Sequence, residues 1–147
     1  MRDITSIYLD NNQLTGGIPT EFGSLNDLEQ IYLHKNLMNG TIPSEIGLME
    51  NLRNFRVYTN GIKGKIPDEI GKAFKLEDFY VQDNLLTGTL PVSMAELTRL
   101  GKFLFVCLNR LLVRAFDLLR LLCLYLRKNP TLLESPDWNS SSAGLCS

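Results

Sequence analysis

Apolar residues recur in this chain with a period of twenty-four, and three of the repeated positions hold a large apolar side chain in every copy. The three columns are Ile4, Leu28, Leu52, Leu76 and Leu100; Ile7, Ile31, Phe55, Phe79 and Phe103; and Leu9, Leu33, Val57, Val81 and Phe105. The last two columns alternate with polar positions, a pattern typical of a short strand with one buried face. One strand per copy, joined by a return path of constant length, predicts a parallel sheet with strands about 4.8 Å apart, stacked as a solenoid.

A polar column follows each predicted strand, where the chain turns out of the sheet. It consists of Asn12, Asn36, Asn60 and Asn84. Backbone groups lose their sheet partners at this point and need others. Because an Asn side chain carries both an acceptor and a donor, we expect these residues to form a ladder that satisfies buried backbone groups from coil to coil.

Glycine and proline mark the return path of each copy. The two columns are Gly16, Gly40, Gly64 and Gly88, and Pro19, Pro43, Pro67 and Pro91. We expect the glycines to provide positive φ or close backbone approach, and the prolines to fix an extended turn. Thr20, Ser44 and Asp68, each followed by Glu, are predicted to be the N-caps of short helical turns.

The run 28–47 has the form LxxLxLxxNxLxGxIPxxIG and resembles the plant-type leucine-rich repeat, the class found in receptor-like kinases and secreted inhibitor proteins. The resemblance covers residues 4 to about 106. It implies an α/β repeat fold, a short right-handed leucine-rich-repeat solenoid whose parallel sheet lines a concave face. It also implies a non-catalytic module that binds a protein or peptide, located outside the cell or at the plasma membrane.

The predicted register identifies the side chains that point outward from the strands. The candidates for partner binding are Tyr8, Tyr32, His34, Lys35, Arg56, Tyr58, Tyr80 and Gln82. Tyr and Arg are enriched where interfaces carry most of their binding energy, and a row of exposed aromatic residues is uncommon on a surface without a partner. The alternative is that Tyr32, Arg56 and Tyr80 only cover the sheet and stack on one another.

His34 is the single histidine, and we expect it to be a solvated or hydrogen-bonded surface residue. A general base would need a positioned nucleophile or a carboxylate pair in a cleft, which a flat repeat sheet does not provide. The sequence contains no Gly-rich phosphate loop and no metal-ligand motif, so it predicts no enzyme, no cofactor and no metal site. Three cysteines without CxxC spacing indicate neither a disulfide framework nor a zinc site.

The charge distribution argues against nucleic acid as a partner. Residues 1–99 carry nine Lys or Arg and thirteen Asp or Glu, so the repeats lack the dense basic stripe that a phosphate backbone requires. No apolar segment of the secretory type follows Met1. The pattern specifies no oligomeric state.

The repeat breaks down after residue 107. We predict leucine-rich repeats over 1–107, about 4.5 copies, an amphipathic helix or cap over 108–128, and a flexible tail over 129–147. Charged residues of the second segment, from Arg110 to Arg127, fall in a narrow stripe at helical spacing, and the other faces are apolar. We expect this helix to cover the last coil, because a terminal repeat must hide its exposed core edge.

Other interpretations of the C-terminal part remain open. A helix over 108–127 would be about 30 Å long, enough to cross a bilayer, but each central charge costs about 2.5–3.5 kcal/mol there. The alternative function is therefore a membrane-associated fragment of a receptor-like leucine-rich-repeat protein, anchored by this helix. A truncated gene model or a shifted reading frame would also produce the break, and the uncovered first copy favours a longer parent protein.

Overall fold

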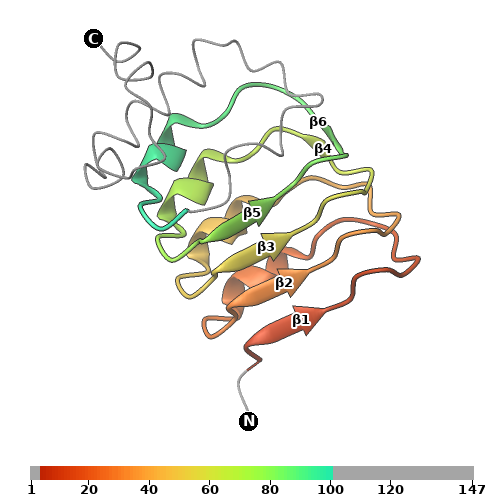
Figure 1. Cartoon of the computed structure of the whole chain (residues 1–147), viewed down its shortest axis with the longest axis horizontal. Coiled ribbons are helices and arrows are strands. Elements are labelled where there is room, and N and C mark those ends of the chain that lie inside the picture. The colour runs from red at the N-terminus through yellow and green to blue at the C-terminus, as the bar shows by residue number, and fades with distance from the viewer. Residues whose placement is uncertain (1–3, 101–147) are drawn as a thin grey trace, which may run out of the picture.

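The structure, a computed structural model, describes residues 4–100, which form successive coils that stack in parallel along one axis (Figure 1). Each coil contributes one three-residue strand to a parallel sheet with the order β1-β2-β3-β5. These strands are β1 (Ser6–Tyr8), β2 (Gln30–Tyr32), β3 (Asn54–Arg56) and β5 (Asp78–Tyr80). Their register matches the sequence repeat, since Ile7 pairs with Ile31, Ile31 with Phe55, and Phe55 with Phe79. The predicted parallel sheet is confirmed.

Short 3-10 helical turns line the side of the coils away from the sheet. They are η1 (Thr20–Ser24), η2 (Ser44–Leu48), η3 (Asp68–Lys72) and η4 (Val92–Glu96). Each turn begins directly after its proline, whose carbonyl accepts the first helical hydrogen bond, as in Ile46 N–H to Pro43 O at 3.2 Å. The N-cap prediction for Thr20, Ser44 and Asp68 is therefore wrong. The N-cap positions are held by Pro19, Pro43 and Pro67, and none of these turns has a side-chain cap.

A second, smaller parallel sheet lies on the return path and was not predicted. It pairs β4 (Lys63–Gly64) with β6 (Leu85–Leu86). An equivalent main-chain hydrogen bond joins the first two coils on this return path, where Asn39 N–H donates to Gly16 O at 2.9 Å. Main-chain hydrogen bonds thus join the coils on two sides.

The core is one apolar column system that runs through the coils. The leucines that open each copy from Leu28 onward are buried. The middle residues of β2, β3 and β5 are buried as well, namely Ile31, Phe55 and Phe79. Phe55 and Phe79 stack with ring centroids 5.6 Å apart. At the N-terminal edge, Ile4 and Leu9 occupy the same columns but are exposed, because the described residues place no coil beneath them.

Two glycines show the separate reasons for this residue in the coil. Gly64 has a φ of +82°, which side chains rarely adopt. Gly40 lacks positive φ, but an added Cβ would lie 2.5 Å from the Cα of Gly17 in the preceding coil. The first glycine therefore provides a left-handed backbone, and the second allows close approach of two coils.

Within residues 4–100, positive φ also occurs at four residues other than glycine, each directly before the ladder asparagine. These are Asn11, Lys35, Thr59 and Asp83, with φ between 53° and 55°. Asn and Asp tolerate this conformation, whereas a β-branched residue such as Thr59 is strained in it.

Replacing Thr59 with Asn should raise the free energy of unfolding by about 1 kcal/mol, because the left-handed backbone costs less for Asn. Thr59 is exposed, so packing changes little. Urea unfolding would measure the gain, with Thr98→Asn as a control at an exposed threonine outside the positive-φ positions. Equal stability of the Thr59 variant and the wild type would contradict the strain.

The predicted helix over 108–128 and the tail over 129–147 lie outside the described residues. Within residues 4–100, no helix combines the length and the apolar character needed to cross a membrane.

Candidate functional site

The outward side of the four-stranded sheet, together with the positions that flank each strand, is called the sheet face here. It comprises five columns: Thr5, Glu29, Arg53 and Glu77; Ser6, Gln30, Asn54 and Asp78; Tyr8, Tyr32, Arg56 and Tyr80; Asp10, His34, Tyr58 and Gln82; and Asn11, Lys35, Thr59 and Asp83. The predicted partner-binding residues all belong to it. The strands hold them at a fixed spacing, because the sheet register leaves each column no freedom to shift.

The central column forms a continuous row of stacked side chains, which we call the aromatic row. Tyr8 meets Tyr32 edge to face, with ring centroids 4.9 Å apart. The guanidinium carbon of Arg56 lies 4.5 Å from the Tyr32 ring centroid and 5.2 Å from that of Tyr80. Arg56 is therefore held between two aromatic rings, in a geometry that suits cation–π attraction.

The aromatic row is anchored by carboxylate and amide groups of the neighbouring column. The Arg56 Nη2 group donates to Asp78 Oδ2 at 2.6 Å, and Asp78 is buried. The Tyr8 hydroxyl donates to Gln30 Oε1. Tyr8 itself remains 57% exposed, so the row reaches solvent most freely at its N-terminal end.

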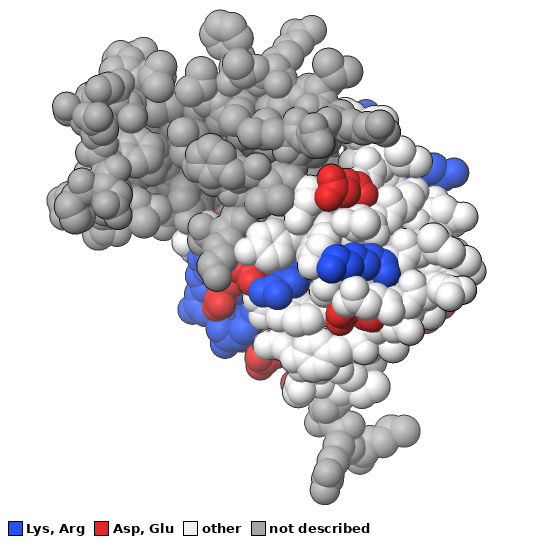
Figure 2. All heavy atoms as spheres, turned by 45° about the vertical axis from the view of Figure 1, so that its right-hand side comes forward, with Lys and Arg blue, Asp and Glu red and all other residues white. Residues whose placement is uncertain are grey.

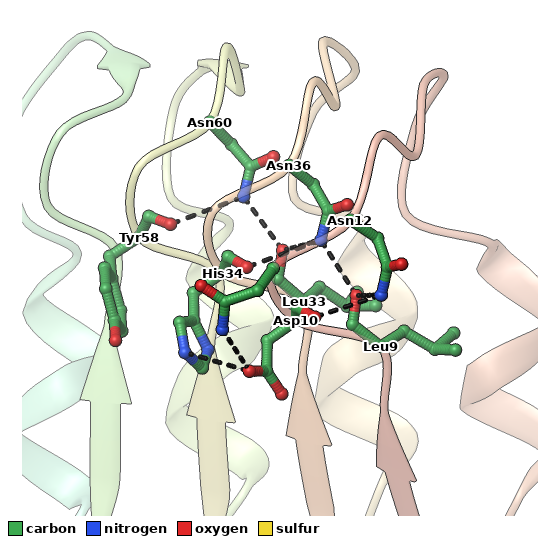
Figure 3. A network of polar contacts seen from close by, with 9 residues as sticks. Leu9, Asp10, Asn12, Leu33, His34, Asn36, Tyr58 and Asn60 are labelled. Carbon is green, nitrogen blue, oxygen red and sulfur yellow. Dashed lines mark hydrogen bonds and ion pairs between the residues drawn. The ribbon is translucent and has the colours of Figure 1, made fainter.

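His34 lies in the next column, between Tyr58 and Asp10 (Figure 3). Its ring stacks on Tyr58, with centroids 4.3 Å apart and an interplanar angle of 19°. Its Nε2 atom lies 3.5 Å from Asp10 Oδ2. Only 9% of His34 is exposed, so the prediction of a surface histidine is wrong. Stacking between adjacent strands buries the ring, a contact that the period alone does not reveal.

The environment of His34 disfavours its charged form. Burial lowers the pKa of His34 below its ordinary value of 6.5, Asp10 acts to raise it, and Lys35 and Arg56 lower it further. The unfolded chain therefore binds a proton near pH 6.5, and the folded chain binds it only at lower pH. The contribution of His34 to the free energy of unfolding is therefore highest above pH 6.5. It is lost as the pH falls from 6.5 through the lower pKa of His34 in the folded chain.

Replacing His34 with Gln should remove part of the pH dependence of stability. We expect the free energy of unfolding of the wild type to fall between about pH 7.5 and about pH 5.5, and the variant to fall less over the same range. Urea unfolding at several pH values in this window measures both slopes. Parallel slopes for the two proteins would show that His34 does not cause the loss.

The remaining predicted residues lie at the rim of the sheet face. Lys35 is exposed and occupies the left-handed turn, with a φ of 55°. Gln82 is half-buried, and its Oε1 atom is buried without a hydrogen-bond partner, as are Nδ1 of His34 and Nε of Arg56. Three polar side chains of this face therefore hold an unsatisfied atom, which is an unusual concentration within a small region.

The asparagine column forms a connected ladder beyond the carboxyl ends of the strands, where the chain turns out of the sheet (Figure 3). The Asn60 side chain donates to Leu33 O and to Val57 O, each at 3.0 Å, and accepts from Met38 N–H at 3.1 Å. Asn36 and Asn84 make the equivalent three contacts in their coils. Asn12 is exposed and donates only to carbonyls of its own turn.

Sequence reasoning missed a line of alternating charges at the start of the strands. Arg53 pairs with Glu77 at 2.8 Å and with Glu29 at 3.5 Å, and all three side chains are partly exposed. Their spacing of twenty-four residues was visible in the repeat, and it would have revealed the contact. Among residues 4–100, no group of three His, Cys, Asp or Glu side chains is arranged to hold a metal ion.

Comparison with known proteins agrees with this geometry. The family model Leucine Rich Repeat matches residues 3–25. The plant peptide hormone receptor RGFR1, solved in complex with RGF2, is 39% identical over 74% of this chain, with a TM-score of 0.71. The described coils are plant-type leucine-rich repeats. No curated protein matches the chain.

Two Arabidopsis thaliana structures support the same assignment. The leucine-rich-repeat ectodomain of the membrane receptor kinase GASSHO1/SCHENGEN3, in complex with CASPARIAN STRIP INTEGRITY FACTOR 2, is 30% identical over 67% of this chain, with a TM-score of 0.65. The BIR3–SERK2 complex is 30% identical over 68%, with a TM-score of 0.64. The leucine-rich repeats of this chain span 17%, 12% and 54% of the RGFR1, GASSHO1 and BIR3–SERK2 chains.

Proposed function

We propose that this leucine-rich-repeat chain is a non-catalytic module that binds a peptide or a protein through its sheet face. The observation that supports it best is the aromatic row. The row holds Tyr and Arg, the residues that contribute most to interface energy, in fixed positions on a solvent-facing sheet. A rigid row loses little conformational entropy when a ligand binds, which favours affinity.

The dimensions of the row suit an extended ligand. Tyr8 to Tyr80 covers three strand spacings, about 14 Å, the length of roughly four residues of extended chain. Similar leucine-rich-repeat structures include RGFR1 in complex with RGF2 and HAESA in complex with the peptide hormone IDA. The corresponding location for this chain is the outer side of the plasma membrane or the extracellular space.

The charged surface is consistent with a protein or peptide partner. On the face drawn in Figure 2, the described residues carry acidic and basic side chains side by side among uncharged ones, without a basic stripe of the kind that nucleic acid requires. The sheet face likewise mixes both signs, which favours a mixed-charge partner.

Selection of peptides from a phage-displayed random library on the purified full chain would test this function. Binding of the enriched peptides should weaken by more than about tenfold for Tyr32→Ala, Arg56→Ala and Tyr80→Ala, because each removes a central part of the row. Fluorescence anisotropy measures the dissociation constants, and thermal unfolding checks that each variant is folded.

The matched control is the double variant Lys63→Ala/Phe74→Ala, which removes an exposed cation and an exposed aromatic ring away from the sheet face. It should bind like the wild type. If the control loses binding, or if all three row variants keep it, the sheet face is not the binding surface.

A further inference from the structure

The sheet face carries more acidic than basic side chains, and its basic side chains are largely engaged. Its carboxylates are Asp10, Glu29, Glu77, Asp78 and Asp83, and its cations are Lys35, Arg53 and Arg56. Both arginines are paired with carboxylates, Arg53 with two of them. The face therefore has an excess of negative charge before any ligand binds.

Asp10 and Asp83 are the two carboxylates of this face that form no ion pair with a Lys or Arg among residues 4–100, and Asp10 lies two positions after Tyr8 of the aromatic row. Its nearest ionisable partner is His34, at 3.5 Å, and burial keeps that ring in the neutral form at neutral pH. Asp10 also accepts a hydrogen bond from the Asn11 side chain at 2.6 Å, which does not neutralise it. Its side chain keeps 28% of its surface exposed, so a ligand can reach it.

The chain already shows how this face holds a cation. Arg56 lies between the rings of Tyr32 and Tyr80 and pairs with Asp78, which is two residues before Tyr80 on the same strand. A guanidinium thus contacts an aromatic ring and a carboxylate that stand two positions apart. Such a site stabilises a cation by both cation–π and charge-assisted hydrogen bonding.

The same two groups recur at the N-terminal end of the aromatic row, without a cation. Tyr8 is the last residue of β1, and Asp10 follows it two positions later on the sheet face, roughly 6.6 Å along the extended chain. The Tyr8 ring is largely exposed, and none of the ion pairs among residues 4–100 brings a Lys or Arg to Asp10. The residue types and the separation of two positions are those found around Arg56, in the reverse order along the chain, because Asp10 follows Tyr8 whereas Asp78 precedes Tyr80.

We propose that the sheet face selects peptides or protein segments that carry an Arg or Lys side chain, and that this cation docks on Tyr8 and Asp10. The proposal rests on the function proposed above and specifies the chemistry of the ligand. A cation at this position would extend the aromatic row by one member and offset the excess negative charge. Electrostatic complementarity of this kind discriminates between ligands of similar shape.

The test uses the peptides enriched on the full chain and synthetic copies in which each Arg is replaced by citrulline or each Lys by acetyl-lysine. Citrulline keeps the length and planar end of the Arg side chain, and acetyl-lysine keeps the Lys stem and adds a neutral acetyl group at Nζ. We expect one such replacement to weaken binding by about tenfold or more, the loss expected for a paired cation on an aromatic face. Isothermal titration calorimetry with the wild type gives the reference values.

The Asp10→Asn variant then locates the cation. It should bind the unmodified peptide about as weakly as the wild type binds the neutral peptide, and it should no longer discriminate between the two. The control Asp68→Asn removes an exposed carboxylate on η3, away from the sheet face, and should keep the full discrimination.

The outcomes separate this proposal from the one on which it rests. Peptides that depend on Tyr32 and Tyr80 but bind equally well after neutralisation would overturn the cation preference alone. Discrimination that persists in Asp10→Asn would overturn the assignment of Tyr8 and Asp10. Peptides that bind regardless of the aromatic row would overturn the proposed function itself.

Discussion

Replacing Phe55 with Ala should lower the free energy of unfolding by about 3–5 kcal/mol, the largest single effect that we expect in this chain. The ring is 1% exposed and lies in β3, between Ile31 and Phe79 in the sheet register. It stacks on Phe79, so the substitution opens a cavity in the middle of the core. The neighbouring coils cannot collapse into it, because the backbone ladders fix their spacing.

Urea unfolding of the full chain, followed by circular dichroism, measures this loss. The control is Phe74→Ala, which removes the same side chain from a position that is 61% exposed and should change stability by no more than about 0.5 kcal/mol. Similar losses for the two variants would mean that Phe55 is not a central core residue.

Replacing Asn60 with Ala should lower the free energy of unfolding by about 1–3 kcal/mol, the cost of one buried group left without a partner. The substitution leaves the Met38 N–H without a hydrogen-bond partner. The carbonyls of Leu33 and Val57 each lose one of two side-chain donors, since Asn36 and Asn84 still donate to them. These groups belong to two adjacent coils, so the loss weakens the stacking of coils as well as the turn itself.

Asn12 provides a control at the same position of the repeat. It is exposed, and its side chain bonds only to Leu9 O and Asp10 O within its own turn. Asn12→Ala should therefore change the free energy of unfolding by no more than about 0.5 kcal/mol. If Asn12→Ala and Asn60→Ala were equally destabilising, the ladder contacts between coils would not be the cause.

Much of the candidate site could be placed from the sequence, because a strict period assigns each residue to a column. Tyr8, Tyr32, Arg56 and Tyr80 were expected on one line, and the structure places them on one line in the sheet register. The burial of His34 could not be predicted, since it depends on how one ring stacks on Tyr58 of the neighbouring strand. The Asp78 partner of Arg56 likewise lies one coil away, in the adjacent column.

The two errors in the fold have separate physical origins. Thr20, Ser44 and Asp68 have the residue types of N-caps, but the preceding proline sets the backbone so that they form the first helical residues instead. The β4–β6 sheet has no alternating apolar pattern of its own, because it consists of two-residue strands brought together by the stacking of coils.

The sequence by itself determined the period, the parallel sheet and the columns of the sheet face, because each coil repeats one short pattern of apolar, polar and glycine positions. Only the tertiary structure decided the contacts between columns. These are the stacking of His34 on Tyr58, the position of Arg56 between two rings, and the pairing of Asp10 with His34. These contacts depend on side-chain rotamers and on the neighbour in the next coil. A repeat pattern specifies which residues are adjacent, whereas packing decides how they meet.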